Sequence, residues 1–215
     1  MGLGRRAILC NAAGLAAFAA AAPAHAAIRC TAFDARGIQF CEAGLDRNLG
    51  AVTAKQEHSQ WCWAACISAI FAYHGFPVDQ DRIVEATYGR RVNLPAHGRA
   101  IASATNRLWT DDGGRRFTSR CQVLWDTGAF VARPDAAAQA AQELAAGNPL
   151  IFGALGHAMV LTAMSFARDA RGHGQPTQAI VRDPWPGRGR RALAAEEWMS
   201  AVFLARVRVV AGGGK

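Results

Sequence analysis

The spacing of apolar and polar positions differs between the two halves of the chain. In the first half, an apolar stretch over residues 60–74 has the length of a helix, with Ser59 placed to cap its start and Gly75 placed to end it. A capping aspartate and a terminal glycine predict a second helix over 79–88. A third helical pattern runs over about 95–108. The first half is therefore expected to be mainly helical.

The second half, which follows the turn-rich segment 111–114, has the texture of strands. Residues 116–125 alternate well enough for a strand, and an alanine-rich helix is expected over 134–146, closed by Gly147. Apolar runs between glycine, proline and charged turns predict further elements, namely strands at 150–154, 157–166, 178–182 and 203–210 and a short helix at 194–200. This order predicts an α+β protein with a helical lobe and a β-rich lobe that meet at a cleft.

The first 26 residues have the composition of a secretory signal peptide. Arg5 and Arg6 give a basic start, an apolar run continues through Ala20, and the Ala-His-Ala triplet at 24–26 offers a cleavage site before Ala27. A membrane anchor is the less favoured alternative, because a span built from alanine is weakly hydrophobic. No second stretch is long enough to cross a bilayer, so the mature protein is expected in the periplasm or outside the cell, without stable membrane insertion.

The chain is basic, and almost all of its positive charge comes from arginine. Its 215 residues carry a net charge of +8. No nucleic-acid-binding motif accompanies this charge, so no nucleic-acid partner is expected. One arginine cluster could attract an acidic surface or peptide, although a solvated basic loop is the simpler interpretation: Arg182, Arg188, Arg190 and Arg191. No cofactor is expected, and the protein is expected to be a monomer.

The expected mature chain has an odd number of cysteines. Removal of Cys10 with the signal peptide leaves Cys30, Cys41, Cys62, Cys66 and Cys121. In an oxidising compartment, this number favours two disulfides and one free thiol. If Cys62 is the free thiol, the favoured pairing is Cys30 with Cys41, which closes a short loop, and Cys66 with Cys121. Sequence alone leaves this connectivity open.

The most informative block runs from Gln56 to Cys66 and reads Gln-Glu-His-Ser-Gln-Trp-Cys-Trp-Ala-Ala-Cys. Cys62 lies near the start of the first predicted helix, where the helix dipole and free backbone N–H groups favour a thiolate. Gln56, six residues earlier, could supply one donor of an oxyanion hole. Cys62 is therefore the candidate nucleophile. Cys66 lies one turn later on the same face and is expected to be structural.

A cysteine nucleophile needs a base, and the base needs an orienting partner. His157 opens a predicted strand directly after Gly156, a glycine that would permit a close approach. Asp183 ends the next predicted strand. If these strands are neighbours, Asp183 can accept a hydrogen bond from one imidazole nitrogen while the other nitrogen faces Cys62. The resulting thiolate–imidazolium pair would lower the pKa of the thiol.

The chain resembles the papain-like cysteine proteases at three patches, which are the Gln56–Cys62-Trp63 block, the His157-Ala158 pair, and Asp183 followed two residues later by Trp185. It is most similar to a small bacterial branch that includes plant-pathogen effector proteases. The resemblance implies Cys62 as nucleophile, His157 as general acid/base and Gln56 as oxyanion donor.

The resemblance also has departures and implications for the walls of the site. Asp183 takes the place where better-known members carry asparagine, which keeps an acceptor for the histidine and adds a charge that favours imidazolium. Trp185 takes the place of the tryptophan that shields this hydrogen bond. Trp63, Trp185 and Gly156 are therefore expected to line the active site.

Each of these residues has a structural alternative. Cys62 could form a disulfide, His157 could be a satisfied core histidine, and Asp183 could be a turn carboxylate. His58, Cys62 and Cys66 could line one helix face as metal ligands, but the expected cap places His58 outside the helix and no fourth ligand is evident, so no metal site is expected. The spacing of the two cysteines also disfavours a thioredoxin-type redox site.

The favoured interpretation is an exported cysteine endopeptidase that hydrolyses a polypeptide substrate through a thioester at Cys62. Two alternatives stay open: the same triad could deamidate or transamidate its substrate, or the scaffold could be an inert secreted binding protein. The expected boundaries are a signal peptide at 1–26, a disulfide-bearing lead-in at 27–55 and a papain-like catalytic domain at 56–215, with its helical lobe at about 56–112 and its β-rich lobe at about 113–212.

Overall fold

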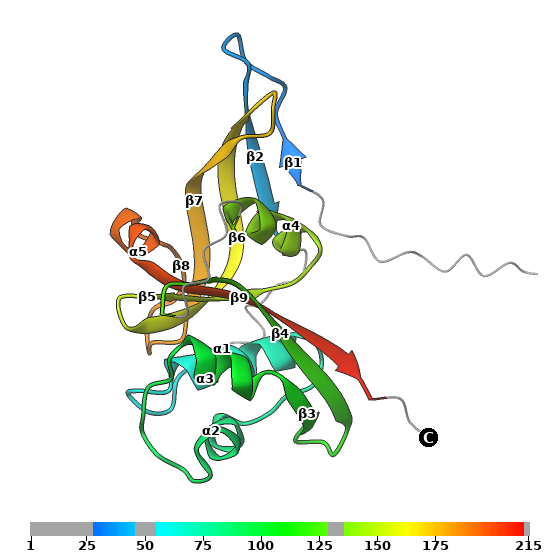
Figure 1. Ribbon diagram of the computed structural model, residues 1–215, viewed down its shortest axis with the longest axis vertical. Coiled ribbons are helices and arrows are strands. Elements are labelled where there is room, and N and C mark those ends of the chain that lie inside the picture. Colours follow the sequence, from blue (N-terminus) through cyan, green and yellow to red (C-terminus); the bar gives the residue numbers. More distant parts are fainter. Residues whose placement is uncertain (1–27, 46–54, 129–135, 213–215) are drawn as a thin grey trace, which may run out of the picture.

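A computed structural model describes residues 28–45, 55–128 and 136–212, and the expected signal peptide lies outside these residues (Figure 1). The fold is α+β, as predicted, with the active-site cleft between a helical lobe and an antiparallel β-rich lobe. The helical lobe contains α1 (Cys62–Tyr73), α2 (Gln80–Tyr88) and α3 (Gly98–Ala104). Within the described residues, the structure has no helix with the length and apolar character that a membrane span requires.

One antiparallel sheet organises the remainder of the described chain. Its strands are β1 (Arg29–Cys30), β2 (Ile38–Gly44), β3 (Arg107–Thr110), β4 (Arg116–Asp126), β5 (Leu150–Ala154), β6 (His157–Asp169), β7 (Gly174–Asp183), β8 (Gly189–Ala192) and β9 (Ala201–Ala211). The main order is β1-β2-β6-β5-β9-β4-β3, and β7 with β8 extends from β6. Two further helices, α4 (Ala136–Ala145) and α5 (Ala195–Met199), complete the β-rich lobe.

Strand β6 connects the parts of this sheet. One of its edges pairs with β5 over residues 157–161 and then with β2 over 163–169. The opposite edge pairs with β7. In Figure 1, β2, β6 and β7 extend upward from the helical lobe as a long projection. The first residue of β6 is His157, so the strand that joins these parts also begins at the candidate base.

The central strands are apolar on both faces because helices cover both sides of the sheet. Along β5, Ile151 packs into the core shared with α1, whereas Leu150 and Phe152 pack into the core shared with α4. Along β6, Val160 faces the first core and Leu161 the second. Side chains alternate between the faces of a strand, so a strand buried on both faces reads as a continuous apolar run. This explains why 150–154 was predicted with its observed bounds.

The helical lobe differs from the prediction at two places. Helix α1 begins at Cys62, and its N-cap is Trp61 without a side-chain cap bond, so the expected cap at Ser59 is wrong. The expected third helix is shorter than 95–108, because α3 ends at Ala104 and the chain then forms β3 against β4. A leucine, a tryptophan and a threonine in β3 favour a strand, and the neighbouring edge of β4 supplies its hydrogen bonds.

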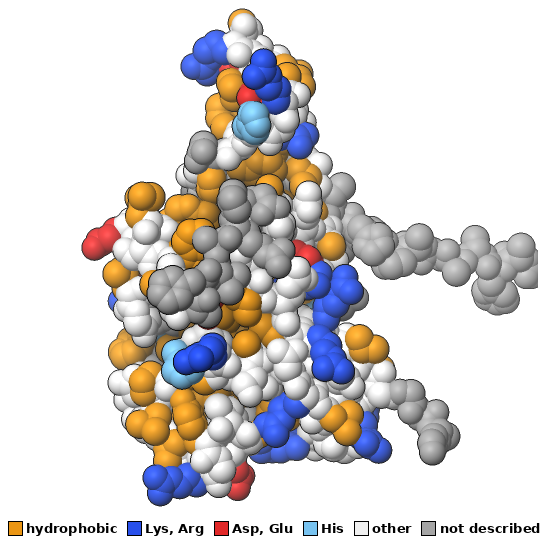
Figure 2. All heavy atoms as spheres, viewed as in Figure 1, with side chains coloured by type: hydrophobic (Ala, Val, Ile, Leu, Met, Phe, Trp, Pro, Cys, Tyr) orange, Lys and Arg blue, Asp and Glu red, His pale blue; other side chains and the backbone are white. Residues whose placement is uncertain are grey.

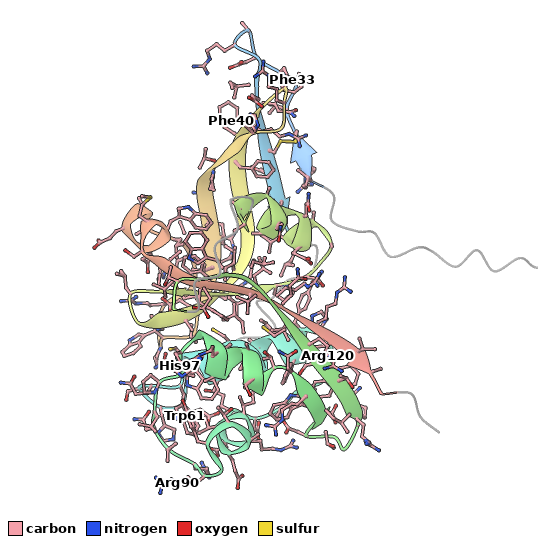
Figure 3. All side chains as sticks on the ribbon, in the orientation of Figure 1. Phe33, Phe40, Trp61, Arg90, His97 and Arg120 are labelled. Carbon is pink, nitrogen blue, oxygen red and sulfur yellow. A yellow bond between two sulfur atoms is a disulfide. The ribbon has the colours of Figure 1, made fainter. Side chains whose placement is uncertain are left out.

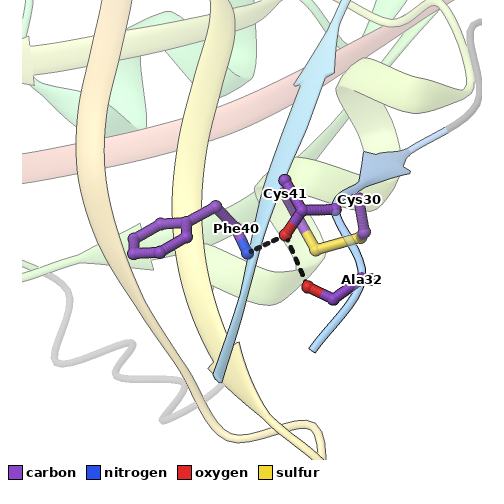
Figure 4. Close-up of a disulfide and its surroundings, with 5 residues drawn as sticks. Cys30, Ala32, Phe40 and Cys41 are labelled. Carbon is purple, nitrogen blue, oxygen red and sulfur yellow. Dashed lines mark hydrogen bonds between the residues drawn. A yellow bond between two sulfur atoms is a disulfide. The ribbon is translucent and has the colours of Figure 1, made fainter. Parts of the chain in front are cut away.

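The lead-in is part of the sheet and not a separate appendage. Strand β2 pairs with β6 over seven residues, and β1 pairs with β2. Cys30 and Cys41 are register partners in β1 and β2 and form the expected disulfide (Figure 4). Beside it, Phe40 N donates to Thr31 Oγ1 at 3.1 Å, and this hydroxyl donates to Ala32 O at 2.9 Å.

The second expected disulfide is wrong, because Cys66 and Cys121 are both free thiols. Cys66 lies on α1 and lines a cavity beside Asp183, whereas Cys121 lies on β4 and interacts with Thr105. Burial raises the pKa of both thiols. Cys62 is therefore one of three free cysteines among the described residues, and it is distinguished by its environment and not by its being unpaired.

The disulfide is expected to stabilise the projection without affecting the cleft. It joins residues separated by 11 positions, and closing a loop of this length stabilises a protein by about 3 kcal/mol through the unfolded state. We expect the Cys30→Ser/Cys41→Ser variant to lose about this amount in urea unfolding, with an unchanged rate of alkylation at Cys62. An equal loss of Cys62 reactivity would show that the two regions are coupled.

Candidate active site

The β5–β6 hairpin places His157 at the edge of the cleft. Ala154 and His157 are register partners, so the turn contains only Leu155 and Gly156. Both have positive φ, 51° and 72°, as in the two-residue turns that match the twist of a hairpin. No atom lies within 4 Å of the place where a Gly156 Cβ would be, so this glycine serves the backbone conformation and not the close approach that was expected.

Asp183 and His157 form the predicted pair. They lie on the neighbouring strands β7 and β6, and His157 Nε2 is 2.7 Å from Asp183 Oδ1. The same oxygen accepts the Trp185 backbone N–H at 2.9 Å. The Asp183 side chain is fully buried and that of His157 is 20% exposed. The bond to Asp183 fixes the imidazole so that its other nitrogen, Nδ1, remains for the thiol.

Cys62 lies at the first position of α1 and faces His157 across the cleft. Its thiol lies close enough to the His157 side chain for the two groups to interact. The Ala158 backbone N–H donates to Cys62 Sγ at 3.4 Å, and the Trp63 N–H also interacts with this sulfur. The amides of the first helical turn have no intrahelical acceptor, so they can stabilise negative charge on the thiolate or on a bound oxyanion.

The protonation states follow from these contacts. Burial of the Cys62 thiol opposes its ionisation, but hydrogen bonds from His157 and the Ala158 N–H outweigh burial and lower its pKa. Burial acts to lower the pKa of His157, but its bonds to Asp183 and Cys62 raise that pKa to about 9. Asp183 keeps its pKa well below the usual range, because donors from His157, Trp185 and Arg191 outweigh burial. The arrangement therefore favours a thiolate–imidazolium pair at neutral pH.

Gln56 is buried beside this pair and is held at both ends of its backbone. Its N–H donates to Pro184 O at 2.9 Å, which ties it to the loop after Asp183. Gln80 binds the flanking residues by donating to Lys55 O at 2.8 Å and by accepting the Glu57 N–H at 3.2 Å. This support could not be predicted from the sequence, because Gln80 is one polar residue at the start of α2.

The Gln56 side chain has a different contact from the one that an oxyanion donor makes. Its Nε2 donates to His58 O at 3.0 Å and to Ser59 O at 3.1 Å, in the turn before α1. Its Oε1 is buried and has no partner among the described residues. A half-turn of the amide in place would set Oε1 against these two carbonyl oxygens, which cannot donate to it. An oxyanion role for Gln56 therefore requires the side-chain amide to move away from them.

The cleft beside Cys62 is a cavity of about 430 Å³ that both lobes line. Trp63 forms part of its wall and donates from Nε1 to Leu94 O at 3.1 Å. At the opposite side, a Cβ on Gly98 would lie 2.5 Å from Asp126 Oδ2 and 2.6 Å from a Phe203 ring carbon. Only glycine therefore allows the start of α3 to come this close to the cleft floor. Figure 3 labels His97, the residue before it, at the same end of α3.

Trp185 lies beside the His157–Asp183 bond, as the resemblance implied. Its ring meets the imidazole edge-on, with centroids 6.3 Å apart. Its exposed fraction is 45%, so it covers the bond from one side only. Of the three expected wall residues, Trp63 and Gly156 line the cleft beside Cys62, whereas Trp185 lines a separate cavity together with Asp183.

A further ion pair extends from the far side of Asp183, and sequence reasoning missed it. Arg191 Nε donates to Asp183 Oδ2 at 2.9 Å. The same guanidinium makes two bonds to Glu197, at 2.6 and 2.7 Å. Cys62, His157, Asp183, Arg191 and Glu197 therefore form a row of alternating charge. Only the density of arginines around position 190 could have drawn attention to Arg191, and it gave no sign of which arginine turns inward.

This set of residues is suited to nucleophilic chemistry. The described residues contain no group of three or more His, Cys, Asp and Glu side chains that could hold a metal. His58 lies before α1, where its ring meets the Trp61 ring edge-on, so it does not join Cys62 and Cys66 on a helix face. The groups that converge are a polarised thiol, an oriented imidazole and free backbone donors, which suit attack on a carbonyl group.

Iodoacetate labelling across pH is expected to report the thiolate–imidazolium pair. The rate at Cys62 should rise at a pH below the ordinary thiol pKa of about 8.5, since His157 stabilises the thiolate. It should fall again near pH 9, when His157 loses the proton that attracts the anionic reagent. Cys66, on the same helix, is the internal control and should stay unlabelled in the folded protein. A Cys62 rate that rises only above pH 8.5 would contradict the pairing.

Substitutions at Arg191 and Glu197 should move the alkaline limb of this profile in opposite directions. Arg191→Gln removes a positive charge beside Asp183, so the carboxylate holds the imidazolium more strongly and the limb moves to higher pH. Glu197→Gln leaves the charge of Arg191 less neutralised, so the limb moves to lower pH. Shifts of the same sign in both variants would indicate simple damage to the fold, and thermal unfolding measured in parallel would show it.

The similarity of this chain to known proteins identifies its family. A search of curated proteins found no match. The peptidase domain of Streptococcus ComA, a bi-functional ABC transporter involved in a quorum sensing pathway, is 17% identical, with 74% of this chain and 97% of that chain covered and a TM-score of 0.45. A double glycine motif protease from an AMS/PCAT transporter, solved with its leader peptide, is 13% identical, with 79% and 99% covered and a TM-score of 0.41. The profile of the Peptidase_C39 like family matches residues 49–208, and the chain belongs to that family.

Proposed function

We propose that this protein is an exported endopeptidase that cleaves polypeptides through a thioester at Cys62. The observation that carries the proposal is the row formed by Cys62, His157 and Asp183. A thiol that interacts with an imidazole, which is itself held at 2.7 Å by a buried carboxylate, is the arrangement that activates a cysteine nucleophile. Membership of the Peptidase_C39 like family supports the assignment as a cysteine peptidase. The proposal does not depend on the resemblance to plant-pathogen effector proteases.

In the proposed reaction, the Cys62 thiolate attacks the carbonyl carbon of a peptide bond bound in the cleft. The carbonyl oxygen gains negative charge, and the free amides of the first turn of α1 lie ready to stabilise it. His157 gives its proton to the leaving amine, and the C–N bond breaks to leave a thioester. His157 then takes a proton from water, which attacks the thioester and releases the free thiol and the new carboxylate.

Asp183 has an orienting and electrostatic role in this reaction. It keeps the imidazole turned so that Nε2 faces the carboxylate and Nδ1 faces the substrate. Because it is an aspartate, it also stabilises the imidazolium that exists before the attack. Gln56 joins as an oxyanion donor after its side-chain amide turns away from the carbonyls of His58 and Ser59. Its fixed backbone keeps this movement small and local.

The proposal places the protein outside the cytoplasm, in the periplasm or beyond. The support is the basic and apolar composition of residues 1–26, followed by a small-residue cleavage site. The Cys30–Cys41 disulfide suits an oxidising compartment. A polypeptide is the proposed substrate, and the protein is proposed to act as a monomer.

Incubation with a peptide library should yield cleavage products whose new termini are identified by mass spectrometry. Cys62→Ala and His157→Ala should each lower the rate by at least about a thousandfold, because each removes part of a unit that acts together. Gln56→Ala should lower it about a hundredfold, as expected for the loss of one oxyanion donor. Asp183→Asn should retain more activity than Asp183→Ala, because the asparagine side chain keeps an acceptor for His157 Nε2.

The matched control is Cys66→Ala, which removes a thiol from the same helix without touching the proposed nucleophile. It should retain activity if it folds, and thermal unfolding will show whether it does. Release of ammonia without chain cleavage would replace the peptidase proposal with deamidation. Labelled Cys62 with neither product from any peptide would favour an inert binding protein.

A further inference from the structure

A second cavity lies behind the catalytic aspartate, on the side away from the cleft. Its volume is about 270 Å³, and its lining residues differ completely from those of the cleft beside Cys62. Its inner wall is apolar and comes from Ala65, Cys66 and Ala69 on α1, Val160 on β6 and Pro184. Asp183 also lines it, but both oxygens of that carboxylate are already bound to donors.

The rim of this cavity is positively charged. Lys55, Arg182 and Arg188 all line it, and Arg190 lies opposite Arg182 in the β7–β8 pair. Partial burial and the positive charge of the neighbouring Arg190 lower the pKa of Arg182, so the two guanidinium groups are close enough to repel each other. Among the described residues, no carboxylate forms an ion pair with Lys55 or Arg190.

The arginines of the cluster at 182–191 lie in two different environments. Arg191 turns inward and belongs to the row that ends at Glu197. The exposed Arg188 reaches only to 3.5 Å from Asp183 Oδ2, which leaves most of its donors available.

We propose that this cavity binds a carboxylate carried on a short aliphatic group. The basic rim would bind the carboxylate, and the apolar wall would bury the aliphatic part. A carboxylate suits the site better than a phosphate, because a doubly charged and strongly hydrated ion would lose more hydration beside the apolar wall. Two sources share this chemistry, which are a short fatty acid and the C-terminal end of a peptide with an aliphatic last residue.

Binding at this site would also reach the active site through Arg188. A carboxylate at the rim would draw the guanidinium away from Asp183 Oδ2 and reduce the positive charge beside that oxygen. The Asp183 carboxylate would then hold the His157 imidazolium more strongly. The alkaline limb of Cys62 labelling by iodoacetate should therefore move to higher pH when the ligand is bound.

Calorimetric titration of the full chain with hexanoate and with N-acetyl-leucine tests the proposal. Each probe should bind saturably with one site per chain, unless only one of the two sources fits. Binding by hexanoate alone identifies a fatty acid, and binding by N-acetyl-leucine alone identifies a peptide C-terminus. Each buried methylene should strengthen binding about fourfold, so hexanoate should bind much more tightly than acetate. Hexylamine, which has the opposite charge, should not bind.

A pair of double variants separates the site from general charge. Lys55→Gln/Arg182→Gln should weaken binding at least tenfold. Arg120→Gln/Arg208→Gln removes the same charge from two exposed arginines that face each other on β4 and β9, and should change binding less than twofold. Figure 2 shows basic side chains on this flank, and Figure 3 labels Arg120. Ala69→Met keeps every charge and narrows the cavity, so it should weaken hexanoate more than acetate.

Three results would overturn the proposal. They are equal losses in both double variants, equal binding of hexylamine, and loss of binding after Cys62 is alkylated, which would place the ligand in the catalytic cleft. Thermal unfolding of each variant guards against a loss caused by misfolding, and Ala69→Met provides an independent test if Lys55→Gln/Arg182→Gln does not fold. Because binding needs no turnover, this outcome is separate from whether the protein is a peptidase.

Discussion

The buried carboxylate of Asp183 is the constraint on which the rest of the site depends. A charged carboxylate without access to water is tolerated only if donors surround it. Here the donors come from the start of β6, the loop after β7 and strand β8, so all three must hold their register for the charge to be stable. The orientation of the His157 imidazole and the inward turn of Arg191 both follow from the need of the Asp183 carboxylate for hydrogen-bond donors.

The helical lobe meets this carboxylate through its own buried surface. Helix α1 is apolar on nearly all sides because it packs between the other helices and the sheet. Its first residue, Cys62, lies at the N-terminal end of the helix, where it lines the cleft. Dense packing fixes the sulfur relative to β6. The lowered pKa of the Cys62 thiol and the raised pKa of the Cys66 thiol follow from this placement, since Cys62 has donors beside it whereas burial dominates at Cys66, one turn of helix later.

Much of this architecture could be predicted where a segment carries its own signal. The run 150–154 is apolar because both faces of β5 are covered, and α2 ends at Gly89 with a left-handed backbone as the spacing indicated. The missed strands are β1, β3 and β8, which span two to four residues each, and the seven-residue β2, and each of them pairs with a neighbouring strand. The Gln56 amide, the inward Arg191 and the absent Cys66–Cys121 bond likewise depend on contacts between distant segments, which local patterns do not encode.

The length of the two-residue turn at Leu155 and Gly156 sets the position of His157, and with it the row of charges from Cys62 to Glu197. Because successive side chains of a strand point to opposite faces, one inserted residue would shift the pairing of β5 with β6 and turn His157 to the other face of the strand, away from Asp183. Length variation among descendants of this chain should therefore collect elsewhere, such as at the far tip of the β6–β7 hairpin. The loop nearest the chemistry is the one least free to grow.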